Sequence, residues 1–145
     1  MTAKTEERFR QLYRAIKRSD LAAIRNALDS GISPDFADKF GWTLLMLAAS
    51  KGTFAIGQLL ISNGADTNRT TRYRNAWFPE QTALSSSIIG GHPRFTKMLL
   101  DNGAMAGPEL TEASVEDWLS VCHHDPMTMS ALKDTFAHYR ARKPN

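Results

Sequence analysis

The chain has 145 residues, of which 42% are hydrophobic, so it can bury the core of one compact domain and is too short for two large ones. Its net charge of +3, without a dense basic stripe, does not favour nucleic-acid binding as the main activity. The first ten residues are polar and charged, and apolar runs such as residues 44–49 are far shorter than the roughly 18 residues of a membrane span. We therefore expect a cytoplasmic protein with no secretory signal and no membrane anchor.

A helical pattern that ends at a glycine recurs along the chain. Gly31, Gly64 and Gly103 each follow a leucine-containing segment, and these glycines are separated by 33 and 39 residues. Upstream, the small or apolar pairs at 15–16, 48–49 and 87–88 keep the same two spacings, so a whole unit recurs. Each unit is predicted to contain two helices and a turn.

The helix pattern is weaker in the first unit than in the second. Residues 20–34 fit a degenerate first unit. In the second unit Thr43 is a suitable N-cap for a short helix, and Gly52 is suited to end that helix. Apolar residues at helical intervals over 54–63 predict an amphipathic second helix, which closes at a glycine that favours positive φ.

The third unit and the C-terminal segment follow the same logic. Thr82 is the expected N-cap of the first helix, and residues 90–91 end it. A second helix is predicted over 95–102. Beyond it the pattern fades, and residues 111–122 and 125–142 are predicted as two closing helices that seal the stack.

Residues 41–49, GWTLLMLAA, followed by Gly52 and by residues 59–68, LLISNGADTN, resemble the ankyrin-repeat family, whose unit of about 33 residues is two antiparallel helices and a hairpin loop. The resemblance covers residues 6–106. It implies one all-α domain, an ankyrin-repeat solenoid of about three helix-turn-helix repeats with a C-terminal helical cap. Its parts are an N-terminal capping repeat, a central repeat, a repeat with an enlarged loop and the C-terminal helical cap, with the bounds 1–35, 36–68, 69–106 and 107–145.

The chain departs from the family pattern at two kinds of position. Where the family has a proline and a histidine after the capping threonine, this chain has Leu44 and Met46 in one unit and Ala83 and Ser85 in the next. The hydrogen bonding that the histidine supplies must therefore be replaced or lost. The longer interval between the second and third glycines enlarges the loop at residues 69–80.

The resemblance implies a non-catalytic protein–protein interaction module, because stacked repeats present their loop tips and concave face to a partner. Aromatic and arginine side chains on the loops before the second and third units are of the types most often found at binding hot spots. The candidate partner-binding residues are Phe40, Trp42, Met46, Arg69, Arg72, Tyr73, Arg74, Trp77 and Phe78. Two alternatives stay open, namely that Trp77 and Phe78 pack the enlarged loop onto the repeats and that Met46 belongs to the core.

The kind of partner is less defined by the sequence. The basic side chains suit an acidic protein partner. Because small bacterial ankyrin proteins include immunity proteins, a toxin-neutralising inhibitor of an effector enzyme is one alternative, and an adaptor in a larger assembly is another. A third is a nucleic-acid-binding accessory role through the arginines of the enlarged loop and the basic residues 140–143. We expect the free protein to be monomeric.

Residues 122–125, Cys-His-His-Asp, combine nucleophile, base and acid types and are the one cluster in the sequence that could suggest catalysis. These residues fall at the junction of two predicted helices, where Asp125 is explained as an N-cap, and they lack the spaced ligand pairs of a zinc motif. The single cysteine, Cys122, cannot form an internal disulfide, which suits a reducing compartment. We therefore expect a protein that is not an enzyme, with no metal site and no cofactor.

Overall fold

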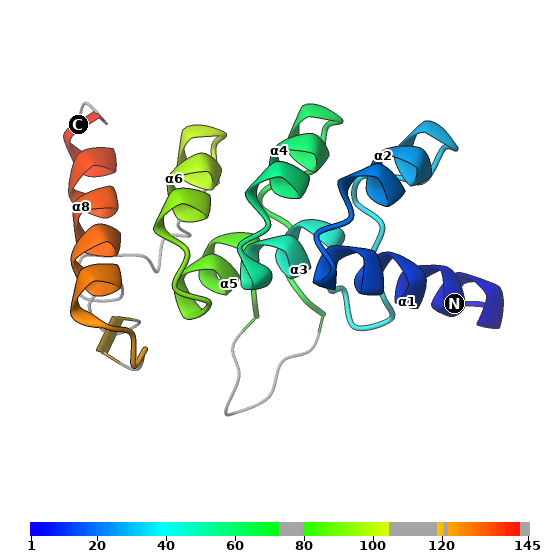
Figure 1. Ribbon diagram of the computed structural model, residues 1–145, viewed down its shortest axis with the longest axis horizontal. Helices are drawn as coiled ribbons and strands as arrows, with labels where there is room; N and C mark the ends of the chain where they lie inside the picture. The colour runs from blue at the N-terminus through cyan, green and yellow to red at the C-terminus, as the bar shows by residue number, and fades with distance from the viewer. Residues whose placement is uncertain (73–79, 105–118, 121, 143–145) are drawn as a thin grey trace.

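The computed structural model describes residues 1–72, 80–104, 119–120 and 122–142, and over these ranges the ordered elements are α-helices arranged in antiparallel pairs (Figure 1). Among the described residues no strand is formed, and a single isolated bridge joins Ala37 to Thr43. None of the described helices is long and apolar enough to cross a bilayer. The helices are α1 (Ala3–Lys17), α2 (Leu21–Asp29), α3 (Leu44–Lys51), α4 (Phe54–Ser62), α5 (Ala83–Ile89), α6 (Pro93–Asp101) and α8 (Pro126–Arg142).

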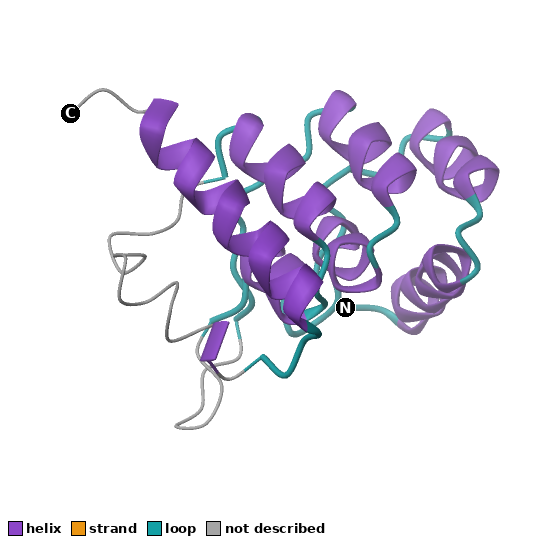
Figure 2. Cartoon of the chain, turned by 60° about the vertical axis from the view of Figure 1, so that its left-hand side comes forward, coloured by secondary structure: helices purple, strands orange, loops and turns teal. Residues whose placement is uncertain are grey.

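The helices form two layers. The first-helix layer contains α1, α3 and α5, which pack side by side, and the second-helix layer contains α2, α4, α6 and α8 (Figure 1). Within a unit the two helices also pack on each other, as α3 does on α4. Figure 2 shows α8 lying beside α6, where it closes the second-helix layer. The expected closing helix over 125–142 is therefore confirmed, whereas most of the one expected over 111–122 lies outside the described residues.

The core is centred on α3, because this helix has neighbours on several sides. Leu44, Leu45 and Met46 are each 1% exposed, and Ala48 and Ala49 are fully buried. A helix that is apolar all round requires such a position. The expectation that Met46 lies on the partner-binding surface is wrong, because its side chain is enclosed where α3 packs between α1 and α5.

The expected threonine caps are present, and the residues beside them show what takes the place of the family's histidine in each unit. The Thr43 Oγ1 accepts a hydrogen bond from the Met46 amide at 3.2 Å. In the third unit, the Thr82 Oγ1 accepts from the Ser85 amide at 3.1 Å, and the Ser85 Oγ accepts from the Thr82 amide at 2.9 Å, which completes a capping box. The hydrogen bonding is thus replaced by Ser85 in one unit and given up for apolar burial at Met46 in the other.

A glycine–histidine contact recurs between successive units. Gly52 ends α3 with φ of +76°, and the His92 ring of the next unit packs against it, with its Nε2 donating to the Ser50 carbonyl at 3.1 Å. His124 repeats this arrangement one unit later. A Cβ added to Gly91, whose φ is +73°, would lie 2.8 Å from the His124 ring. The segment before α8 is thereby joined to the third unit as that unit is joined to the second.

Candidate functional site

The hairpin tip at residues 38–42 is held by one carboxylate. The Asp38 Oδ1 accepts hydrogen bonds from the Phe40 and Trp42 amides, each at 2.9 Å. The Gly41 amide donates to the Asp38 carbonyl at 3.1 Å, and Gly41 adopts a φ of +86°, which an L side chain rarely adopts. These bonds fix a turn that leaves Phe40 45% exposed while Trp42 is half-buried.

This tip contacts the base of the enlarged loop. The Arg72 amide donates to the Phe40 carbonyl at 2.7 Å, and a Cβ on Gly41 would lie only 2.9 Å from the Arg72 nitrogen. The loop base is closed where Thr71 and Gln81 pair, because the Thr71 amide donates to the Gln81 carbonyl at 3.0 Å. The two loops therefore contact each other through the backbone of Phe40 and Arg72.

A pocket of about 340 Å³ lies between the hairpin tip and α1. Its walls come from Met1, from α1, from the tip and from one residue of α3, so it belongs to the first-helix layer. Phe40 and Trp42 contribute aromatic surface, and Tyr13, which is 37% exposed, contributes more from α1. The lining residues are Met1, Glu6, Phe9, Arg10, Tyr13, Asp38, Lys39, Phe40, Trp42 and Leu47.

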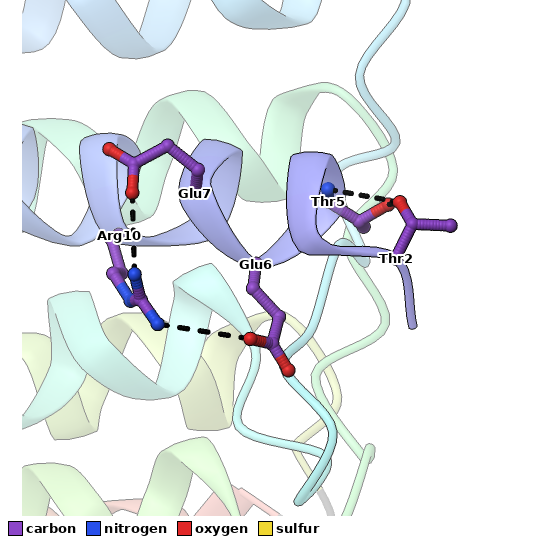
Figure 3. A network of polar contacts seen from close by, with 5 residues as sticks. All are labelled: Thr2, Thr5, Glu6, Glu7 and Arg10. Carbon is purple, nitrogen blue, oxygen red and sulfur yellow. Dashed lines mark hydrogen bonds and ion pairs between the residues drawn. The ribbon is translucent and has the colours of Figure 1, made fainter.

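The charges around this pocket are unevenly compensated. Arg10 is paired with Glu6 at 3.8 Å and with Glu7 at 3.4 Å (Figure 3). By contrast, the ammonium groups of Lys17 and Lys39 lie over aromatic rings of the pocket. No carboxylate among the described residues lies within ion-pair distance of either lysine.

The α1 helix itself is anchored at its start. The Thr2 Oγ1 accepts from the Thr5 amide at 3.2 Å, which supplies the N-cap (Figure 3). Phe9 and Leu12 face the core from the same helix. The contribution of α1 to the pocket was missed by the sequence analysis, although an exposed tyrosine on an amphipathic helix was the available signal.

The predicted site residues fall into four groups. Phe40 and Trp42 line the pocket, whereas Arg69 and Arg72 are exposed on the neighbouring loop. Met46 is in the core and so is removed from the site. Outside the described residues lie Tyr73, Arg74, Trp77 and Phe78.

The side chains of residues 122–125 that form hydrogen bonds contact the backbone of the helical scaffold. The His124 Nε2 donates to the Ile88 carbonyl at 2.9 Å, and the Asp125 carboxylate accepts from the amides at the start of α8. Burial raises the pKa of the Cys122 thiol, which disfavours the nucleophilic thiolate. Across the described ranges no group of three or more His, Cys, Asp or Glu side chains could hold a metal ion.

Several known proteins share part of this sequence. The Ankyrin repeat, SAM and basic leucine zipper domain-containing protein 1 of Atelerix albiventris is 36% identical over 64 residues, which are 44% of this chain and 14% of that protein. The E3 ubiquitin-protein ligase hecd-1 of Caenorhabditis elegans is 32% identical over 104 residues, or 71% of this chain and 4% of that protein. The E3 ubiquitin-protein ligase Ufd4 of Drosophila melanogaster is 34% identical over 101 residues, or 69% of this chain and 3% of that protein.

The chain spans at most 14% of the length of these relatives, so the likeness concerns a repeat segment and not their other parts. A family model described as ankyrin repeats in three copies matches residues 12–111. Such repeats are generally non-catalytic and serve in protein–protein interaction. Because the match covers more than half of the chain and the helices stack in the expected pairs, the chain belongs to the ankyrin-repeat family.

Proposed function

We propose that this chain is a non-catalytic module that docks a protein partner on its tip surface, which we define as hairpin tip 38–42, the exposed residues Arg69, Thr70 and Arg72, and the pocket-lining side of α1. The observation that carries the proposal is the hydrogen bond from the Arg72 amide to the Phe40 carbonyl, because it joins two loops into one continuous surface.

The tip surface has the composition of a binding site. Phe40 and Tyr13 are both exposed although they are large and apolar, and arginines lie beside them. Aromatic and arginine side chains dominate binding energy at protein interfaces. The hydrogen bonds that hold Asp38, Phe40 and Trp42 make the tip rigid, so little conformational entropy is lost on docking.

Photo-crosslinking tests the proposal. A photoreactive phenylalanine analogue at Phe40 should capture a partner of defined mass in cells of the source organism, and the same analogue at Gln58 should not. Gln58 is the matched control, because its side chain is also exposed but lies on α4 in the second-helix layer. Crosslinks to the same protein from both positions, or from position 58 alone, would place the binding surface elsewhere and overturn the proposal.

Substitutions on the same surface provide a second test of the proposal. Phe40→Ala with Arg72→Ala should abolish capture of the partner, whereas Arg25→Ala with Gln58→Ala on the second-helix layer should leave it intact. The identity of the partner then separates an inhibitor from an adaptor, since an inhibitor should block one enzyme stoichiometrically. The toxin-neutralising role and the cytoplasmic location stay predictions, because neither the described surface nor the names of the relatives contain a feature specific to them.

A further inference from the structure

An Asn-Gly pair directly follows the second helix of two units, namely Asn63-Gly64 after α4 and Asn102-Gly103 after α6. In a flexible chain this pair cyclises more readily than asparagine before a larger residue, because glycine lets its own nitrogen approach the asparagine side chain without hindrance. Independently of which partner docks, we infer that Asn63 and Asn102 are latent deamidation sites, which the folded chain locks and whose conversion loosens the helix ends that they flank.

The reaction uses only groups of the chain and water. The Gly64 nitrogen attacks Cγ of Asn63, and the new C–N bond closes a succinimide ring. The side-chain nitrogen of Asn63 leaves as ammonia and takes the proton of the glycine amide with it. Water then opens the ring at either carbonyl, which yields aspartate or isoaspartate. Nothing is oxidised or reduced, and each conversion adds one negative charge.

Hydrogen bonds hold both reacting groups at the end of α4. The Gly64 amide donates to the Ile61 carbonyl at 2.9 Å. The Asn63 Nδ2 donates to the Leu59 carbonyl at 2.8 Å, so the side chain lies back along the helix and away from the nitrogen that must attack it. Because Asn63 is exposed, water can reach it, and the protection comes from these two bonds and not from burial.

The same arrangement recurs at the end of α6. The Gly103 amide donates to the Leu100 carbonyl at 3.2 Å, and the Asn102 Nδ2 donates to the Met98 carbonyl at 2.8 Å. The Gly103 carbonyl also accepts from the Asn68 Nδ2 of the central unit at 3.1 Å. Isoaspartate at position 102 would add a carbon to the backbone just before Gly103, and would therefore displace a carbonyl that joins two units.

Conversion acts on the helix end through charge as well as geometry. The Asn63 and Asn102 side chains each donate to a carbonyl in the last turn of a helix, where the backbone carbonyls lack a full set of intrahelical partners. A carboxylate cannot donate this bond. Its negative charge also lies at the C-terminal end of the helix, where the macrodipole disfavours it. Deamidation should therefore weaken the same helix end whose hydrogen bonds had prevented it.

The first test compares deamidation rates in the folded and the unfolded full chain. After incubation at mildly alkaline pH with and without guanidinium chloride, mass spectrometry of peptides reports amide-to-acid conversion at each asparagine. Asn63 and Asn102 should convert about tenfold or more slowly in the folded chain, because the reaction waits for local opening of the helix end. Asn26, which precedes alanine, is the internal control and should convert slowly in both states. Equal folded and unfolded rates at positions 63 and 102 would overturn the inference.

A glycine substitution tests the chemistry separately from the fold. In guanidinium chloride, where neither chain is folded, Gly64→Ala should slow conversion at Asn63 about tenfold, because the added Cβ hinders approach of the nitrogen. Conversion at Asn102 in the same chain should be unchanged. An unchanged rate at Asn63 would refute the succinimide route.

Substitution by aspartate tests the consequence of conversion. Asn63→Asp places the product carboxylate at the end of α4, and at neutral pH it should lower the folding equilibrium constant about tenfold in urea unfolding. Gln58→Glu is the matched control, because it makes the same amide-to-acid change at an exposed position in the middle of α4. It should lower the folding equilibrium constant less than about threefold. Equal losses in the two variants would reduce the effect to net charge and refute the role assigned to the helix end.

Discussion

Gly52→Ala should destabilise the protein more than Gly64→Ala, although both glycines follow a helix with positive φ. The φ angles are +76° at Gly52 and +88° at Gly64, so the left-handed backbone conformation should destabilise an alanine by roughly 1–2 kcal/mol at each position. A Cβ at Gly64 meets open space, whereas one at Gly52 would overlap the His92 ring. Only the second substitution therefore disturbs the contact between units.

The expected magnitudes follow from these terms. An added methyl group lowers the entropy of the unfolded chain, which offsets about 0.4–1 kcal/mol of the strain, so Gly64→Ala should cost about 1 kcal/mol. Displacing the His92 ring adds overpacking of about 1–3 kcal/mol and weakens the hydrogen bond from Nε2 to the Ser50 carbonyl. Gly52→Ala should therefore cost about 2–4 kcal/mol.

The assay is urea unfolding followed by far-ultraviolet circular dichroism, with tryptophan fluorescence as a second probe to check for one transition. A double-mutant cycle isolates the contact. In the His92→Ala background the ring is absent, so Gly52→Ala should cost no more than Gly64→Ala does. Equal losses for the two glycines in the unmodified chain, or a Gly52→Ala penalty that His92→Ala leaves unchanged, would refute this account of the interface.

Three further predictions concern the core and the C-terminal segment. Phe95→Ala should lower the free energy of unfolding in urea by about 3–5 kcal/mol, because the Phe95 side chain is only 1% exposed. Adding Gly57→Ala should recover part of this loss, since the new Cβ would occupy space left by the ring, and a further loss in the double variant would contradict the packing. Hydrogen bonds from Thr128 lower the pKa of the Asp125 carboxyl in the folded state, so its stabilisation of α8 is present above the unfolded pKa of about 3.9 and is lost as the pH falls through the folded value. The loss of helicity as the pH falls should therefore be smaller in Asp125→Asn than in the unmodified protein. Identical curves of helicity against pH for the two proteins would argue against the cap. Because burial raises the pKa of the Cys122 thiol, alkylation by iodoacetamide at mildly alkaline pH should be slower in the folded protein than in urea, and equal rates would count against it.

The sequence predicted only some of the residues that line the pocket. Phe40 and Trp42 were identified because aromatic residues in a loop are conspicuous. Tyr13 was not, because its helix lies more than twenty residues earlier in the chain and meets the tip only through stacking of α1 on α3. Met46 was misplaced for a related reason, since burial depends on which faces of α3 its neighbours cover.

Local sequence, by itself, determined the repeating helices and where they begin and end. The threonine caps, the helix periodicity and glycines such as Gly52 act within a few residues, where backbone sterics and hydrogen bonding depend on sequence alone. The tertiary structure decided what those elements present to a partner. It placed His124 against Gly91, joined the Arg72 amide to the Phe40 carbonyl and formed the pocket, because each of these contacts lies between separate units that meet only after the helices stack.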